Sequence, residues 1–151
     1  YKYDEVNAVL ASGCGTLADV EARLTALAAV RPTENFEPLA ASFKRISNIL
    51  KQAAFDPSTV LDDALFEEAA ESDLHIEFER VRTMARGASY QKALEAVASL
   101  RPKVDTFFDT VLVNAKDERV RINRLTLLHN LLTEFSTIAD FSEIVTSGDT
   151  K

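Results

Sequence analysis

Cysteine is nearly absent from this 151-residue chain, in which Cys14 is the only one. A single cysteine excludes an intramolecular disulfide and a cluster of thiolate metal ligands, and it favours a reducing compartment such as the cytoplasm. Long apolar runs are also missing, because none approaches the roughly 18 to 20 residues that span a bilayer, and the first residues lack the pattern of an export signal. We therefore expect a cytoplasmic protein without a membrane partner.

Positive charge is scarce as well. Seventeen Lys and Arg stand against 24 Asp and Glu, and the resulting net charge of −7 disfavours wholesale binding to DNA. Methionine occurs only at Met84, so Tyr1 is not a translational start, and we expect a domain excised from a longer polypeptide. With 46% hydrophobic and 27% charged residues, residues 1–151 have the composition of a single globular domain with a packed core.

Helical periodicity runs through the first third of the chain. Apolar residues recur at intervals of three or four over residues 3–11, 17–30 and 36–54, with Thr16 as a candidate cap of the second stretch and Pro38 in the first turn of the third. These patterns predict three consecutive helices. The stripe of the third helix consists of Leu39, Phe43, Ile46, Leu50 and Ala53.

A run of acidic residues marks the middle of the chain. Residues 61–79 hold eight Asp and Glu and no Lys or Arg, whereas Arg80, Arg82 and Arg86 follow and Gly87 comes next. Acids early and arginines late suit the macrodipole of one helix, and glycine is a common helix terminator. We expect a helix with a solvated acidic face that ends at Gly87.

Further helical segments are expected in the second half. Ser89 resembles an amino-terminal cap for a helix over residues 90–100. Pro102 breaks or kinks this helix, and helical periodicity resumes over residues 104–113. Asp117 caps a last long helix, and the strand-like residues 111–113 are too few to found a sheet. The expected fold class is therefore all-α, a helical bundle. The apolar stripe of the last helix is Val120, Leu127, Leu128, Leu131, Phe135 and Ile138.

Recognisable catalytic patterns are missing. The chain has neither a P-loop nor a dinucleotide fingerprint, which Gly13 and Gly15 match only weakly. His75 and His129 fall on different predicted helices without the spacing of a zinc site, and the acidic run lacks the ligand spacing of a calcium loop. We expect no catalytic site, no metal and no cofactor in this domain.

Two short basic clusters stand out against the acidic background. From residue 40 to residue 54 the chain carries Lys44, Arg45 and Lys51 and no acid. At about 3.6 residues per turn, Lys44, Asn48 and Lys51 align, with Arg45 one step around, opposite the apolar stripe. Cations beside an amide match the phosphates and a base edge of a nucleic acid.

The second cluster, residues 116–124, has a similar make-up, with Asn123 among the charges. An ordinary solvated helix face with ion pairs between neighbouring turns is the alternative interpretation of both clusters, and composition alone leaves both open. The basic residues of the second cluster are Lys116, Arg119, Arg121 and Arg124, against Asp117 and Glu118.

Five segments carry a resemblance to a known family. They are YDEVNAVLA at residues 3–11, FKRISNIL at 43–50, VDTFFDTVLVNA at 104–115, RINRLTLL at 121–128 and ADFS at 139–142. In this order they resemble the carboxy-terminal region of bacterial glycyl-tRNA synthetase beta subunits, in which the second segment is similar to the signature helix. The resemblance covers about residues 3–141.

The resemblance implies a helical anticodon-binding domain of the DALR type, similar to that of arginyl-tRNA synthetase, at the C-terminal end of a beta chain. It implies the anticodon loop of glycine tRNA as ligand, and the rest of the beta subunit and the alpha subunit as partners in an alpha/beta heterotetramer-type complex. Glycine activation, with ATP and Mg²⁺, belongs in that family to the alpha subunit. The literal Asp-Ala-Leu-Arg tetrapeptide is absent, since residues 63–66 read Asp-Ala-Leu-Phe.

An anticodon loop presents unstacked bases to side chains, while Lys and Arg bind its phosphates. Arg124 also aligns with Val120 and Leu131, so we weigh a structural role for it equally. Phe107 and Phe108 are expected to be core residues rather than stacking platforms. The expected roles are phosphate contacts for Lys44, Arg45 and Lys51, a base-edge contact for Asn48, and a second wall against the loop or a base plane for Arg121 and Arg124.

Two other functions stay open. In one, the chain is a protein-interaction module whose acidic helix meets a basic partner, and its distinguishing sign is an exposed apolar patch. In the other, the chain is the DALR-type domain of a different aminoacyl-tRNA synthetase, such as the arginyl or cysteinyl enzyme.

Overall fold

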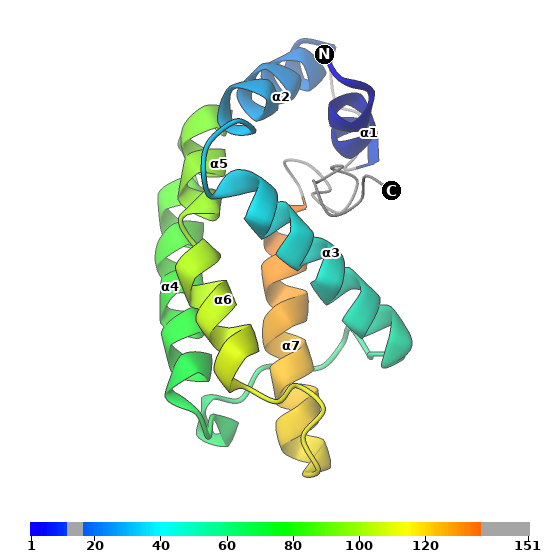
Figure 1. Ribbon diagram of the computed structural model, residues 1–151, viewed down its shortest axis with the longest axis vertical. Helices are drawn as coiled ribbons and strands as arrows, with labels where there is room; N and C mark the ends of the chain where they lie inside the picture. Colours follow the sequence, from blue (N-terminus) through cyan, green and yellow to red (C-terminus); the bar gives the residue numbers. More distant parts are fainter. Residues whose placement is uncertain (12–16, 137–151) are drawn as a thin grey trace.

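The computed structural model describes residues 1–11 and 17–136 of the chain (Figure 1). No strand occurs within these described residues, and the expected all-α fold class is confirmed. Residues 111–113, the strand-like run of the sequence, form no strand in the structure. The helices are α1 (Tyr3–Ala11), α2 (Leu17–Val30), α3 (Phe36–Gln52), α4 (Ala69–Ala85), α5 (Tyr90–Ala98), α6 (Arg101–Thr110) and α7 (Glu118–Phe135), with a 3-10 turn, η1 (Asp63–Leu65), before α4.

The helices pack side by side as a bundle. α4 lies along α5 and α6, which follow one another down its flank, and α3 crosses the molecule to pack against α6 and α7. α2 packs on α5, and α1 packs on α2. The carboxyl ends of α3 and α6 and the amino end of α7 all lie toward the lower end of Figure 1. Residues far apart in the sequence therefore come together there.

The predicted apolar stripe of α3 forms part of the core. Leu39, Phe43, Ile46 and Leu50 are buried, but Ala53 is exposed, because the helix stops at Gln52. The stop coincides with a left-handed residue, Ala54, at φ 50°. On α7 the predicted stripe is likewise buried from Val120 to Phe135, and Ile138 lies outside the described residues.

The acidic helix begins later than the sequence indicates, at Ala69 rather than near residue 61. Asp62 instead accepts a hydrogen bond from the backbone N–H of Ala64 and caps η1. Glu68 and Glu71 form a reciprocal capping box that starts α4. The carboxylates before residue 68 therefore belong to a connecting loop. The predicted stop at Gly87 is confirmed, since this residue has φ 76°.

The predicted caps in the second half are also confirmed. Ser89 accepts from the N–H of Lys92 at 3.3 Å, and Asp117 accepts from the N–H of Arg119 at 2.9 Å. α6 is shifted toward the N-terminus relative to the expectation, because Pro102 fits the first turn, where a missing N–H breaks no helical bond. The helix ends where Val111 turns extended, at φ −109°.

Buried charge ties the first helix to the bundle. Arg31, after α2, donates to Asp4 at 2.7 Å and to Glu5 at 3.1 Å, both on α1. The hydrogen bond to Asp4 is the main reason that the pKa of Arg31 is raised above its usual range. The proposed cap Thr16, the lone Cys14 and the segment at 139–142 lie outside the described residues. Among the helices of the described part, none has the length and hydrophobicity to cross a membrane.

Candidate RNA-binding surface

Lys44, Arg45, Asn48 and Lys51 share one side of α3, which we call the α3 basic face. Arg45, Asn48 and Lys51 are exposed and Lys44 is half-buried. The buried stripe on the other side of the helix fixes this orientation, because turning the helix would expose its apolar residues. Within the described part of the chain, no carboxylate forms an ion pair with Arg45 or Lys51.

Arg45 is held by an aromatic ring. Its guanidinium carbon lies 4.1 Å from the centroid of the Phe108 ring, on α6, which is the geometry of a cation–π contact. Phe108 packs edge-on against Phe107 at 5.6 Å between centroids, with 82° between the ring planes. Phe107 is fully buried, as expected, while Phe108 is half-buried. The Arg45 head is thus anchored to the core through two rings.

The two basic clusters adjoin at one point. Arg121, on the first turns of α7, is half-exposed and lines the same cavity as Arg45. Its only ion pair in the described residues is a loose one, 4.0 Å to the exposed Glu118 on the preceding turn. A pair of this kind contributes little and leaves the guanidinium able to bind another anion. Arg45 and Arg121 therefore form a common positive edge.

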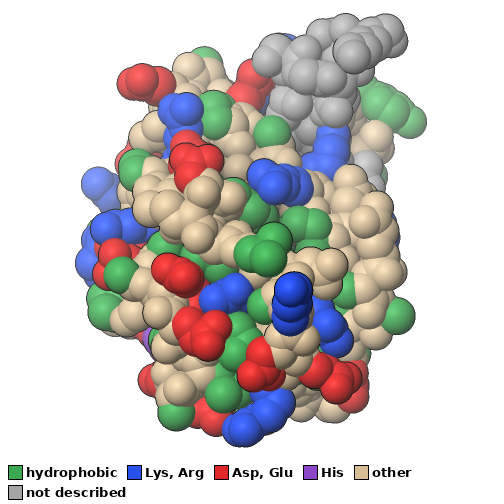
Figure 2. Space-filling view, turned by 60° about the horizontal axis from the view of Figure 1, so that its bottom comes forward, with side chains coloured by type: hydrophobic (Ala, Val, Ile, Leu, Met, Phe, Trp, Pro, Cys, Tyr) green, Lys and Arg blue, Asp and Glu red, His purple; other side chains and the backbone are tan. Residues whose placement is uncertain are grey.

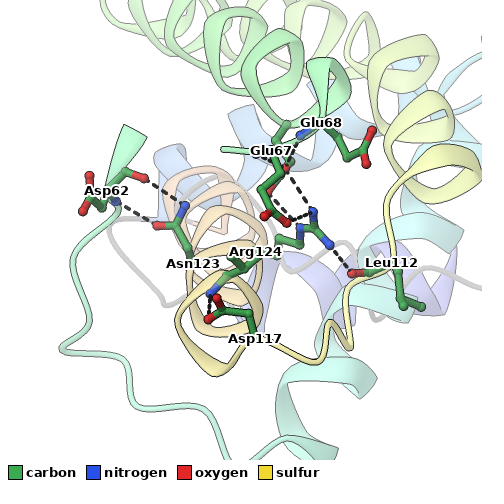
Figure 3. A network of polar contacts seen from close by, with 9 residues as sticks. Asp62, Glu67, Glu68, Leu112, Asp117, Asn123 and Arg124 are labelled. Atoms are coloured by element: carbon green, nitrogen blue, oxygen red, sulfur yellow. Dashed lines mark hydrogen bonds and ion pairs between the residues drawn. The ribbon is translucent and has the colours of Figure 1, made fainter. Parts of the chain in front are cut away.

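Arg124 does not belong to this surface, and the expectation of an RNA contact is corrected. The residue is buried, with 5% of its area exposed. Its Nε donates to Glu71 at 2.9 Å, and its Nη1 donates to the carbonyl oxygen of Leu112 at 2.6 Å (Figure 3). Glu67 lies 3.5 Å from Nη2. The guanidinium is fully occupied inside the protein, so the alternative role of bracing two helices holds.

Asn123, the neighbour of Arg124, is also structural. Its side chain accepts from the N–H of Asp62 at 2.8 Å and donates to the carbonyl of the same residue at 3.0 Å (Figure 3). Only 2% of Asn123 is exposed. The amide thus replaces a backbone partner for the loop that leads into η1, and it is not available to a base.

A cavity of about 490 Å³ opens between α3, α6, the α6–α7 connection and α7. Its apolar lining includes Ile49, Val111 and Leu125, and its polar lining consists of the two arginines and the amides of Gln52 and Asn114. Figure 2 looks toward the lower end of the bundle, where basic side chains lie directly beside hydrophobic and acidic ones. This end of the bundle therefore has a surface of mixed charge and polarity, and it is not a continuous basic patch.

Gln52 and Asn114 were not among the residues predicted from the sequence. Gln52 follows Lys51 at the end of α3, and Asn114 lies in the connection between α6 and α7. A neutral amide at a helix end or in a loop carries no periodic or charge signal. Only the packing of α3 against α6 and α7 brings the two amides to one cavity.

The histidines pack against aromatic rings. His129 lies 5.1 Å from Phe55 and His75 lies 5.8 Å from Phe66, measured between ring centroids. Within the described residues, no group of three or more His, Cys, Asp or Glu side chains is arranged to hold a metal ion.

The acidic helix α4 is partly neutralised by its own arginines. Arg80 pairs with Glu77, and Arg82 pairs with Glu79. The hydrogen bond from Arg80 is the main cause of the lowered pKa of Glu77. The large apolar side chains of α4 that are exposed are Ile76 and Met84, two turns apart. Single exposed residues of this kind do not make the apolar patch that a protein-interaction module requires.

The part of the chain that carries this surface is similar to known proteins. A family model described as the DALR anticodon binding domain matches residues 39–144, which include the α3 basic face and all of α7. The glycine–tRNA ligase beta subunit of Acidobacterium capsulatum is 47% identical over 97% of this chain and 22% of that protein. The corresponding beta subunit of Geobacter metallireducens is 45% identical over 93% of this chain and 21% of that protein.

The chain spans about a fifth of the length of these relatives. The resemblance to beta subunits noted in the sequence is confirmed, and so is the DALR-type fold. Since the family match covers most of the residues, the chain belongs to the family of DALR anticodon binding domains.

Proposed function

We propose that this chain binds the anticodon loop of glycine tRNA as the anticodon-recognising part of a glycine–tRNA ligase beta subunit. Family membership supports anticodon binding, and the names of the relatives support the glycine enzyme. The observation that carries the proposal is the junction of Arg45 and Arg121 at one cavity, which extends the α3 basic face onto α7.

The residues take distinct roles on this surface. Lys44, Arg45 and Lys51 contact phosphates, which fixes the register of the loop without reading its sequence. Asn48, exposed between the cations, offers both a donor and an acceptor to a base edge. Arg121, on α7, forms a second wall against the RNA loop or a base plane. Because the whole chain has a net charge of −7, it repels polyanions in general, and only an RNA loop that docks on the α3 basic face is attracted.

The proposal extends to the partners. The remainder of the beta subunit and the alpha subunit accompany this domain in a cytoplasmic alpha/beta complex of the heterotetramer type. Glycine activation with ATP and Mg²⁺ takes place on the alpha subunit, and this domain contributes no cofactor. Its part in aminoacylation is to select and position the tRNA.

The test measures binding of glycine tRNA by the complete ligase at several salt concentrations. Lys51→Ala should weaken binding several-fold and reduce the slope of log affinity against log salt by about 0.7, because one phosphate contact is lost. Asn48→Ala should weaken binding without changing the slope. Lys92→Ala, an equally exposed lysine on α5, is the matched control and should change neither.

Unchanged affinity and aminoacylation with Lys44→Ala, Arg45→Ala and Lys51→Ala, in proteins that fold normally, would reject the α3 basic face. Exchange of glycine tRNA for arginine or cysteine tRNA separates the glycine enzyme from another ligase with a DALR-type domain. A preference for either of those tRNAs would contradict the glycine assignment while leaving anticodon binding intact.

A further inference from the structure

We propose that the cavity between α3, α6 and α7 is a nucleobase pocket, which takes one unstacked base of the RNA loop bound along the α3 basic face. This inference rests on the proposed function and names a site within it. The cavity, at about 490 Å³ and open to solvent on one side, is roomy enough to admit a planar ring together with water. It lies beside the α3 basic face, because Arg45 belongs to both.

The interior of the cavity suits the faces of a base. Ile49, Val111 and Leu125 line it from three different segments, and Val111 and Leu125 are at most 6% exposed. An aromatic base that leaves its stack in a single-stranded loop loses apolar contacts, which a lining of this kind restores.

One wall of the cavity is a prearranged planar cation. The guanidinium of Arg45 is fixed over Phe108 at 4.1 Å, and Phe108 is in turn fixed against the buried Phe107. Guanidinium planes and aromatic rings are the groups on which proteins stack unpaired RNA bases. Arg45 can therefore meet a base with its plane and the adjacent phosphate with its charge.

The rim of the cavity carries the groups that can read a base edge. Gln52 and Asn114 are both exposed and both line the cavity, from α3 and from the α6–α7 connection. In the described residues neither side chain makes a hydrogen bond within the protein. Each amide has a donor and an acceptor, so the two together match the alternating edge of a nucleobase.

The α6–α7 connection is positioned in advance. The buried Arg124 donates to the carbonyl of Leu112, which also lines the cavity. A site whose wall is held by a buried ion pair loses less conformational freedom on binding than a free loop does. Arg124 is thus a positioning residue of the pocket and makes no contact with the base.

The experiment uses the complete ligase and glycine tRNA transcripts that carry an abasic nucleotide at each position of the anticodon loop in turn. An abasic nucleotide keeps its phosphate and removes only the base. Ala53→Leu places bulk in the cavity from an exposed position just beyond α3. Ala22→Leu, on the exposed side of α2, makes the same change away from the cavity.

For the parent and for Ala22→Leu, removal of the base at one loop position should lower affinity about fivefold or more. For Ala53→Leu, intact tRNA should already bind more weakly by a similar factor, and the abasic change at that position should have no further effect. The salt dependence of binding should be the same in all three proteins, because no phosphate contact changes. Equal losses in the three proteins at every abasic position would overturn the pocket.

Gln52→Ala and Asn114→Ala provide a second measurement, which does not depend on filling the cavity. Both should reduce the discrimination among the four bases at the identified position, and unaltered discrimination in both variants would also overturn the pocket. The proposed function fails separately, when Lys44→Ala and Lys51→Ala, two changes on the α3 basic face that leave the cavity lining intact, do not alter tRNA affinity. If those variants weaken binding and the cavity variants do not, only the nucleobase pocket is wrong.

Discussion

The guanidinium of Arg124 on α7 forms an ion pair of 2.9 Å with Glu71 on α4, a carboxylate with no exposed surface. The Glu71 carboxylate also has partners near its own helix, since its Oε2 accepts hydrogen bonds from the backbone N–H groups of Glu67 and Glu68. The pair therefore joins the start of one helix to the middle of another, and through Leu112 it reaches the edge of the cavity. Because both partners are completely hydrogen-bonded, the cost of removing the two charges from water is offset.

Removal of one partner should unfold the domain more readily. Arg124→Ala leaves the Glu71 carboxylate buried and unpaired, so the free energy of unfolding should fall by about 3–5 kcal/mol. Urea denaturation followed by circular dichroism measures this. Adding Glu71→Gln, which removes the charge and can still serve in the capping box, should recover part of the loss. Arg119→Ala, at an exposed position on α7, is the control. A normal urea midpoint for Arg124→Ala with loss of RNA binding would return Arg124 to the RNA surface.

Asn123 should be needed for the loop before α4. Asn123→Ala removes both hydrogen bonds to Asp62 and leaves backbone groups without partners, so we expect a loss of about 1–3 kcal/mol in the free energy of unfolding. The amide hydrogen of Asp62 should exchange faster with solvent, as measured by nuclear magnetic resonance. Asn48→Ala, at an exposed site, should leave both quantities unchanged. Unaltered exchange at Asp62 in Asn123→Ala would contradict the bond.

Gly87 should be hard to replace for backbone reasons alone. Its φ of 76° is unfavourable for a side chain, although a Cβ there meets no atom within 4 Å. Gly87→Ala should therefore lower the free energy of unfolding by about 1–2 kcal/mol. Gly87→Asn should lose less, because asparagine tolerates this region better. Thermal unfolding compares the two. An equal melting temperature for the parent and Gly87→Ala would show that the terminus of α4 adjusts freely.

Acid should weaken the Glu77–Arg80 pair on α4. The pKa of Glu77 is lowered chiefly by the hydrogen bond from Arg80, so this pair stabilises the folded state above the ordinary glutamate pKa and loses its effect as pH falls through the lowered value. Both side chains are partly exposed, so the contribution is about 0.2–1 kcal/mol. Glu77→Gln should flatten this part of the pH dependence of unfolding, and Glu21→Gln should not. Identical pH profiles for the parent and Glu77→Gln would contradict the shift.

The helices were predictable because each depends on local pattern. The burial of Phe43 and Ile46 follows from spacing, the stop at Gly87 from its backbone freedom, and the start of α7 from the cap Asp117. The start of α4 was predicted wrongly, because a run of carboxylates does not show where a capping box lies. Glu68 and Glu71 decide that boundary through bonds to the backbone.

The candidate site was predictable only in part. Sequence spacing indicates that Arg45 and Lys51 face away from the core. It also aligns Arg124, but not Arg121, with the apolar residues Val120 and Leu131, which leaves both a structural role and an RNA contact open for Arg124. These two arginines lie within one turn of α7, and their environments differ because Glu71 and Leu112 approach only Arg124. Glu71 lies 53 residues from Arg124 along the chain, and Leu112 lies in the connection before α7, so tertiary packing decides which cation faces solvent.

The interlocking of Arg124 with Glu71 also has an evolutionary consequence. A substitution at either position alone leaves a charge stranded in the interior, so the two positions should change together during divergence. Arg121 has no buried ion-pair partner in the described residues, so selection for a different ligand can change this position independently. Within one turn of α7, the residue at position 124 should therefore change only together with position 71 on α4, whereas position 121 can change alone.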